Sequence, residues 1–390
     1  MKIGIDARMY GPKVGGGGLG RYVEQLVTEL QATDGQDRFI LFLKRENFDD
    51  CVVTNPRFEK RLADFHWYGV TEQLRFPSLI AREKLDLMHF PHWNVPILSR
   101  TPFVVTIHDL ILLEEPRSAK ITTRNPILFQ VKRFGYHIAL HRALHRARRI
   151  IAVSEYTKSS ISKFFAKLDA KKVIVAHEGV TALRLSSRGG TADEGSLVGS
   201  SARSFGLRPL DDEKPYVLYV GNAYPHKNLN RLLDAFALVR TKHPELELVL
   251  AGREDVFYKR LMLEAHATQR DTNVRYIATP SDDTVAELYR NARAFVFPSR
   301  TEGFGLPPLE AMQAGVPVAS STGGSLPEIL SDAAKYFSPN NTQDMAGVIE
   351  QIITDEHLRT SLVARGHERI KHFHWRDHAQ AALNTYHSAL

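Results

Sequence analysis

The sequence lacks the features that mark disulfide-bonded, membrane-spanning and metal-cluster proteins. Its 390 residues include a single cysteine, Cys51, which excludes a disulfide scaffold and a multi-cysteine metal site. No apolar run approaches the roughly 20 residues that cross a bilayer. No Asp-x-Asp pair occurs, so the simplest carboxylate clamp for a metal-bound nucleotide is missing, and we expect no metal site. The chain starts directly with the strand-like MKIGID, without an apolar signal region, which predicts a cytoplasmic protein.

Charge is unevenly distributed between the two halves of the chain. Residues 1–180 carry a net charge of +9, whereas the whole chain carries +7. The densest basic patch, HRALHRARR at residues 141–149, has two interpretations that the sequence leaves open: a solvated helix end, or a surface for phosphate or lipid headgroups. No aromatic side chains alternate with these cations, which argues against nucleic acid as a partner.

Short β-branched runs alternate with longer helical patterns along most of the chain. This alternation predicts an α/β fold with parallel strands buried on both faces. The predicted strands are Lys2–Ile5, Phe39–Leu43, Leu85–Phe90, Phe103–His108, Ile150–Val153, Val173–His177, Tyr216–Val220, Leu246–Ala251, Val274–Ala278, Ala294–Pro298 and Val316–Ser320.

A segment rich in Ser and Gly, residues 186–205, separates the two halves and is too polar to pack a core. We therefore predict two Rossmann-like domains, residues 1–180 and 214–374, joined by a linker at 181–213. The last helix, residues 375–390, is expected to return to the first domain. Two facing parallel sheets would place a ligand site in the cleft between them.

The segment EGFGLPPLE at residues 302–310 is the strongest local signal for a ligand site. Its glycines let the backbone pass close to a ligand, and a helix beginning at Pro308 would point its positive end at an anion such as a diphosphate. Glu302 in the loop and Glu310 in the first helical turn could hold different hydroxyl pairs of one ligand. The alternative is a strand–helix turn with a capping acid.

A glycine run at residues 15–20 follows the first predicted strand and precedes a helix expected to begin at about Arg21. Glycine loops before a helix can cradle phosphates, but the run could equally be a mobile loop. Its spacing does not fit the G-x-G-x-x-G dinucleotide motif.

Two further segments carry a candidate charged side chain. Lys227 lies just before a helix that we expect Asn228 to cap, where its ammonium could neutralise a phosphate; a surface lysine is the alternative. His108 ends a predicted strand, and the adjacent Asp109 could fix its tautomer; a buried structural histidine is the alternative.

Together these segments resemble the retaining family 4 glycosyltransferases of the GT-B fold, in which two Rossmann-like domains face each other across a central cleft. The resemblance covers Ile3 to about Trp375. It rests on GGLGRY at residues 17–22, TIHD at 106–109, YVG and HKN between 219 and 228, and the double-glutamate segment.

The resemblance implies a role for each motif. Glu310 would hold the donor ribose, Glu302 the transferred sugar, Lys227 the diphosphate, and His108 the region of the anomeric carbon. Many members carry an arginine shortly before the lysine; it is absent here, and Arg253 could replace it. The implied catalytic residues are His108, Lys227 and Glu302, and the implied donor-binding residues are Gly17, Gly18, Gly221, Asn222, Lys227, Arg253, Gly303, Phe304, Gly305, Leu306 and Glu310.

We therefore expect a retaining, metal-independent hexosyltransferase without a cofactor. GDP-mannose is the favoured donor, a UDP-hexose is the other option, and the acceptor would be a glycan or a lipid-diphosphate-linked sugar in cell-surface polysaccharide synthesis. The basic first domain would let the protein bind an anionic inner membrane face. A sugar-nucleotide epimerase of the same fold and a non-catalytic nucleotide-sugar binding protein are the alternatives.

Overall fold

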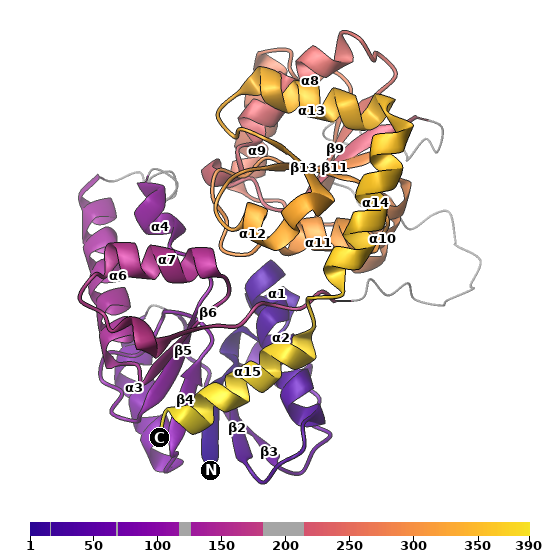
Figure 1. The fold of residues 1–390 in the computed structure, drawn as a ribbon. Helices are drawn as coiled ribbons and strands as arrows, with labels where there is room; N and C mark the ends of the chain where they lie inside the picture. Colours follow the sequence, from indigo (N-terminus) through magenta and orange to yellow (C-terminus); the bar gives the residue numbers. More distant parts are fainter. Residues whose placement is uncertain (16, 68, 117–125, 182–213) are drawn as a thin grey trace. The chain divides into compact units, whose positions relative to one another are not determined.

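The chain folds into two compact units. The computed structural model describes residues 1–390 apart from residues 16, 68, 117–125 and 182–213 (Figure 1). One unit comprises Met1–Val180 with Phe373–Leu390, and the other comprises Thr181–His372. The linker expected at 181–213 therefore lies, apart from its first residue, outside the described residues.

The first unit contains a seven-stranded sheet in which all paired strands are parallel, in the order β3-β2-β1-β4-β5-β6-β7. Helices α2 and α15 lie side by side against it (Figure 1). The strands are β1 (Lys2–Asp6), β2 (Arg38–Leu43), β3 (Phe58–Leu62), β4 (Leu87–Phe90), β5 (Phe103–Ile107), β6 (Arg149–Ala152) and β7 (Val173–Val175). The helices are α1 (Pro12–Gly15), α2 (Gly17–Ala32), α3 (Val70–Arg82), α4 (Ile111–Glu114), α6 (Pro126–Arg146), α7 (Glu155–Phe164) and α15 (Trp375–Ser388).

The second unit contains a six-stranded parallel sheet in the order β10-β9-β8-β11-β12-β13. Helices α8 and α13 pack side by side (Figure 1). The strands are β8 (Tyr216–Val220), β9 (Glu247–Gly252), β10 (Val274–Ala278), β11 (Ala294–Phe297), β12 (Val318–Ser321) and β13 (Ala334–Phe337). The helices are α8 (Leu229–Arg240), α9 (Val256–Ala267), α10 (Asp282–Asn291), α11 (Leu306–Gln313), α12 (Leu326–Leu330), α13 (Thr342–Thr354) and α14 (Glu356–Ile370).

In each sheet the strand order reverses beside the first strand of the unit. β1 pairs with β2 on one side and with β4 on the other, and β8 pairs with β9 and β11 in the same way. Parallel sheets bind ligands at the carboxyl ends of the two strands that flank such a reversal. The topology thus singles out two positions: the loops after β1 and β4, and the loops after β8 and β11.

The sequence patterns predict the inner strands and miss two outer ones, β3 and β13. β3 reads FEKRL and only its first residue, Phe58, is buried. An outer strand pairs on one side only and does not need a continuous apolar run, so the pattern typical of buried strands is absent. None of the described helices has both the length and the apolar character needed to cross a bilayer.

The C-terminal helix α15 is bound to the first unit through buried polar side chains. The Tyr386 hydroxyl lies 2.7 Å from Nδ1 of His89, whose Nε2 lies 2.9 Å from Oγ1 of Thr106. The Tyr22 hydroxyl lies 3.0 Å from the same Thr106 oxygen and 2.9 Å from Nε2 of His378. A protonated imidazole in this network would be a buried charge, so burial lowers the pKa of His89 to about 3.

We predict that replacement of His89 by glutamine makes the first unit less sensitive to acid. The folded state favours neutral His89, so the unfolded chain binds more protons below its ordinary pKa of about 6.5, and the free energy of unfolding falls as pH drops toward 3. At pH 5 this histidine should cost on the order of 2 kcal/mol relative to pH 7. Urea unfolding at both pH values, followed by tryptophan fluorescence, measures the loss in the first unit, which contains Trp67, Trp93 and Trp375.

The matched control is His137→Gln, because His137 is exposed. It should lose as much stability between pH 7 and pH 5 as the unaltered chain. An equally large loss in His89→Gln would contradict the interpretation of the network.

Candidate functional site

The two loops that follow β8 and β11 bring Lys227 and Glu302 together. The Lys227 ammonium donates a hydrogen bond of 2.6 Å to Oε1 of Glu302. Both side chains are largely buried, 14% and 9% exposed respectively. This ion pair lies where the strand order reverses, so the two charged residues implied by the resemblance occupy the expected ligand-binding edge of the second sheet.

Backbone and amide contacts fix these two loops to each other. The Arg300 backbone N–H donates to the His226 carbonyl at 2.7 Å. The Asn228 amide donates to the carbonyls of Pro298 and Pro339, at 3.1 and 2.8 Å. Asn228 adopts the left-handed conformation (φ 64°) and directly precedes α8, but its side chain does not cap the helix. The prediction of a capping Asn228 is therefore wrong, since the amide joins the loops instead.

The turn after β8 depends on close backbone packing. Gly221 has a φ of +153°, and a Cβ there would lie 2.7 Å from the Tyr219 hydroxyl. The Gly221 carbonyl accepts a 2.8 Å hydrogen bond from Tyr258. The Asn222 carbonyl accepts another, of 2.7 Å, from Tyr219. The hydroxyl groups of two buried tyrosines thus donate hydrogen bonds that hold the backbone carbonyls of this turn toward the core.

The helix after the double-glutamate loop begins earlier than the sequence predicts. α11 starts at Leu306, with Gly305 before it at a φ of +104°. The prediction of a start at Pro308 is wrong by two residues, because Leu306 and Pro307 already adopt helical conformation. Glu310 therefore lies beyond the first turn, where its carboxylate is buried and lies 3.2 Å from the Tyr289 hydroxyl. The phenol on α10 orients this acid, a contact between distant segments that no local motif indicates.

A second glycine pair, Gly323–Gly324, supports the loop of Glu302. Gly324 has a φ of +66°, and a Cβ there would lie 2.4 Å from the backbone N and O of Glu302. The neighbouring Ser325 donates its backbone N–H to the Glu302 carbonyl at 3.0 Å and its hydroxyl to the Phe304 carbonyl at 2.9 Å. The motifs predicted from the sequence do not include this segment, although a Gly-Gly pair shortly after an apolar run is a visible signal.

Two buried polar atoms near the ion pair have no hydrogen-bond partner among the described residues. One is Nδ1 of His226, the residue before Lys227. The other is Oγ of Ser299, which lies in the loop that leads to Glu302. Burial lowers the pKa of His226 to about 4, and the adjacent Lys227 charge contributes to the shift, so the ring is neutral at pH 7. A buried polar group without a hydrogen-bond partner destabilises the folded state, so these two atoms are candidates for hydrogen bonds to a bound ligand. The described part of the chain shows no cluster of three metal-binding side chains.

Arg253 is exposed just after β9, the strand next to β8. Burial raises the pKa of the Tyr224 phenol, and the positive charge of Arg253 partly offsets that rise. Arg253 therefore lies at the same edge of the sheet as the turn after β8, with its guanidinium accessible to solvent.

The described glycines of the run at residues 15–20 are helical rather than looped. α2 begins at Gly17, so Gly17 and Gly18 form its first turn, and the predicted start at about Arg21 is wrong. A Cβ at either position would meet nothing within 4 Å, whereas one at Gly20 would lie 2.2 Å from the Gly11 carbonyl oxygen. Close packing requires glycine at Gly20, and Gly17 and Gly18 leave open space at the helix start.

His108 pairs with an acid distant in sequence. Its Nδ1 lies 2.9 Å from Oε1 of Glu178, and its Nε2 lies 2.9 Å from the Pro91 carbonyl. Asp109, predicted to fix the tautomer, instead accepts the Ile111 backbone N–H at 3.0 Å. Although burial lowers the pKa of His108, the hydrogen bond and charge of Glu178 raise it above its ordinary value overall. Both ring nitrogens face acceptors, so the ring is held as a hydrogen-bond donor.

Comparisons with known proteins agree with this geometry. Residues 16–182 match the model of Glycosyltransferase Family 4, and residues 203–369 match that of Glycosyl transferases group 1. An O-antigen chain mannosyltransferase B from Escherichia coli is 29% identical over 95% of both chains. A sucrose-phosphate synthase from Thermosynechococcus elongatus has a TM-score of 0.74 at 20% identity and covers 99% of this chain and 98% of its own. HepE from Anabaena, in complex with UDP and glucose, has a TM-score of 0.70 at 17% identity over the whole of both chains.

Two parallel sheets, each with a reversal of strand order, and a double-glutamate loop at one reversal define a glycosyltransferase of the GT-B fold. The chain is a glycosyltransferase whose residues 16–182 match Glycosyltransferase Family 4 and whose residues 203–369 match Glycosyl transferases group 1.

We predict that Gly324→Ala destabilises the second unit. Its positive φ and the close approach to Glu302 backbone atoms should cost roughly 1–3 kcal/mol. A loss of about 2 kcal/mol corresponds to a Tm lower by roughly 4–8 °C for a unit of this size. Thermal unfolding followed by far-ultraviolet circular dichroism measures the change.

Gly347→Ala is the control, because this glycine lies inside α13 and a Cβ there would meet nothing within 4 Å. Its Tm should stay the same or rise slightly, since alanine favours the helix. Equal melting temperatures for the two variants would show that the Gly324 segment does not constrain the loop.

Proposed function

We propose that this glycosyltransferase moves a hexose, with mannose favoured, from a nucleotide-sugar donor to a glycan or lipid-linked acceptor in cell-surface polysaccharide synthesis. The observation that carries the proposal is the buried Lys227–Glu302 pair at the strand reversal of the second sheet. The 29% identity to an O-antigen chain mannosyltransferase over nearly the whole chain supports mannose, with GDP-mannose as the favoured donor and a UDP-hexose as the other option.

The site offers complementary groups for each part of such a donor. We assign the diphosphate to the Lys227 ammonium, to backbone amides at Gly303–Leu306 and to the start of α11, because an ammonium and a helix N-terminus both attract anions. When the donor binds, the Lys227 ammonium would donate to the phosphate in place of Glu302. The Glu302 carboxylate would then accept hydrogen bonds from hydroxyls of the transferred sugar. Glu310, oriented by Tyr289, would accept the ribose hydroxyls. Arg253, Gly221 and Asn222 border the same edge and would contact the nucleotide.

The chemistry follows from where charge develops. The bond between the anomeric carbon and the distal phosphate oxygen breaks, and its electron pair stays on that oxygen. The acceptor hydroxyl oxygen bonds to the anomeric carbon and its proton passes to the departing phosphate. Lys227 and the backbone amides stabilise the growing negative charge, so we propose that no metal ion is needed. Attack on the face that the phosphate leaves gives retention of configuration and requires no enzymic nucleophile.

We propose that His108 lies against the donor sugar as a cation and does not act as a general base. Nδ1 faces Glu178 and Nε2 faces the Pro91 carbonyl, and both of these partners accept from the protonated ring, which then has no lone pair to accept a further proton. The open start of α2 at Gly17 and Gly18 would let a phosphate approach the first unit closely.

Association with an anionic membrane face from the cytoplasmic side is also a proposal. Within the basic segment 141–149, Arg146 donates to the Ile97 and Ser99 carbonyls and Arg149 to Ser388, so these two cations stabilise the fold. Arg142 and Arg148 are exposed and would contact lipid headgroups.

We predict that Lys227→Ala lowers kcat at least about 100-fold, because leaving-group stabilisation is lost. Glu310→Ala should mainly raise the donor KM, roughly tenfold or more, because the ribose loses a charged acceptor. Transfer from a panel of nucleotide sugars is assayed in excess EDTA, and the anomeric configuration of the product is read by proton NMR.

Lys242→Ala is the matched control, since Lys242 also forms an ion pair in the second unit, with Glu350, but on the exposed surface. It should keep full activity. Full activity in Lys227→Ala and Glu310→Ala would refute the site, loss of activity in EDTA would refute metal independence, and an inverted product would refute retention.

A further inference from the structure

Glu178 is a buried acid beside His108 that belongs to none of the sequence motifs described above. It follows β7, and its side chain is 6% exposed. Its Oε1 atom lies 2.9 Å from Nδ1 of His108, whose side chain keeps 19% of its surface exposed. A buried carboxylate is stable only when a donor or a cation faces it. Among the described residues, the His108 ring is the hydrogen-bond partner that meets this need.

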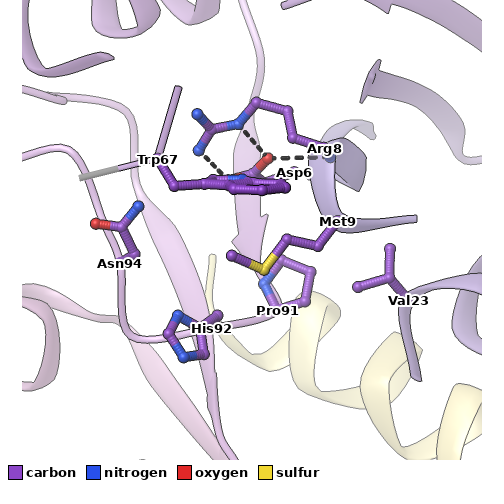
Figure 2. Close-up of a pocket in the computed structure, with 8 residues that line it drawn as sticks. All are labelled: Asp6, Arg8, Met9, Val23, Trp67, Pro91, His92 and Asn94. Atoms are coloured by element: carbon purple, nitrogen blue, oxygen red, sulfur yellow. Dashed lines mark hydrogen bonds and ion pairs between the residues drawn. The ribbon is translucent and has the colours of Figure 1, made fainter. Parts of the chain in front are cut away.

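A different loop holds the other ring nitrogen of His108. Its Nε2 atom lies 2.9 Å from the carbonyl oxygen of Pro91, which can only accept a hydrogen bond. Pro91 and His92 follow β4 and line the small pocket that Figure 2 shows. A neutral imidazole has one N–H group and satisfies one acceptor, whereas a protonated imidazole has two and satisfies both. The geometry therefore favours the protonated ring.

Four titratable side chains from other elements lie near His108, and none of them is charged at pH 7. Burial lowers the pKa of His89 on β4, and that of His92 after it, to about 3. Burial also lowers the pKa of His378 on α15. Burial raises the pKa of the Tyr22 phenol on α2, whose ring lies edge-on to His108 with the centroids 4.5 Å apart. The charge of the His108 ring therefore depends on nearby acids.

Two acids, Glu178 and Asp109, act on this ring. Burial lowers the pKa of His108, whereas the hydrogen bond and charge of Glu178 raise it, and the charge of Asp109 adds to the rise. The pKa lies above its ordinary value as a result. The Asp109 carboxylate accepts the Ile111 backbone N–H at 3.0 Å. Glu178 is therefore the acid that contacts the ring directly.

The C-terminal segment fixes the backbone that carries Glu178. A Cβ at Gly179 would lie 2.2 Å from the backbone nitrogen of Trp375, so these two stretches of chain cross in direct contact. On the other side of Glu178, the His177 carbonyl oxygen lies 3.1 Å from Nδ1 of His378 on α15. Contacts before and after Glu178 thus restrict its backbone, and the carboxylate reaches the imidazole from a fixed position.

We propose that Glu178 is a positioning residue for the transfer reaction, which fixes the orientation of His108 and keeps its ring protonated against the donor sugar. The proposal rests on the proposed function and makes it more specific, because it names the group that holds His108 as a cation. Without the carboxylate, burial would favour the neutral ring, which has one N–H group and loses one of its two fixed contacts.

NMR of the histidine side chains in the full chain tests the protonation without any need for activity. The histidine rings are labelled with nitrogen-15, and the His108 signals are assigned by their loss in His108→Gln. At about pH 7.5 both His108 nitrogens should carry a proton, and in Glu178→Gln the titration should move to lower pH by at least about one unit. A neutral His108 ring in the unaltered chain at about pH 7.5 overturns the proposal, whether or not the variant folds.

The pH dependence of the rate tests the positioning role. The rate is measured as release of nucleoside diphosphate from GDP-mannose and from UDP-glucose, with methyl mannoside as the acceptor. In Glu178→Gln, kcat should fall roughly tenfold or more at about pH 7.5. It should recover as the pH is lowered, because the ring then regains its proton. Glu178→Asp keeps the charge, so its kcat should follow the pH profile of the unaltered chain.

Glu46→Gln is the matched control, because Glu46 is an exposed acid of the same unit, paired with Lys44 at 3.0 Å. It should keep the His108 titration and the kcat of the unaltered chain, and circular dichroism verifies that each variant is folded. The proposal is overturned if His108 titrates identically in Glu178→Gln and in the control. It is also overturned if kcat falls equally at every pH, as the loss of a general base or of packing would cause.

The two measurements separate this proposal from the proposed function. Absence of nucleoside diphosphate release from either donor by the unaltered chain would refute the proposed function, while the NMR titration would still decide whether Glu178 keeps His108 protonated. Normal release by the unaltered chain, with the same pH profile in Glu178→Gln, would refute only the role of Glu178.

Discussion

The reversal of strand order beside β1 and β8 is the constraint on which the functional organisation depends. Elsewhere in a parallel sheet, successive connections pass over the same face and cover the ends of neighbouring strands. At a reversal they leave toward opposite faces, so polar loop residues can meet a ligand there. Each unit of this chain places buried charged side chains at its reversal: Lys227 with Glu302 in one, and Arg8 with two carboxylates in the other.

The two charged clusters differ in how much charge remains for a ligand. Burying ions costs several kcal/mol each, and removing one partner of a buried pair typically costs about 3–5 kcal/mol, so each cluster must be balanced. Lys227 faces one carboxylate in a site where further backbone donors can share an anion. Arg8 faces two carboxylates, and among the described residues only its Nη1 atom has no hydrogen-bond partner. The proposed anion site therefore belongs to the second unit, whereas the two carboxylates beside Arg8 balance its charge within the fold of the first unit.

Much of the fold and the central pair of the site could be predicted from the sequence, because both depend on local patterns. Apolar runs identify the inner strands, and motifs directly after two such runs place Lys227 and Glu302 at one edge. Contacts between distant segments could not be predicted in this way. Glu178 lies 70 residues from His108, and Tyr289 lies 21 residues from Glu310. The outer strands β3 and β13 and the starts of α2 and α11 were also not predicted correctly, since contacts with neighbouring backbone determine them more than periodicity does.

The most direct test of the central claim is a crystal structure of the full chain with GDP-mannose bound. The account predicts a diphosphate oxygen within hydrogen-bond distance of the Lys227 ammonium and of backbone amides in Gly303–Leu306, with the ribose hydroxyls on Glu310. A nucleotide sugar bound away from the ends of β8 and β11, with the contact between Lys227 and Glu302 unaltered, would contradict it.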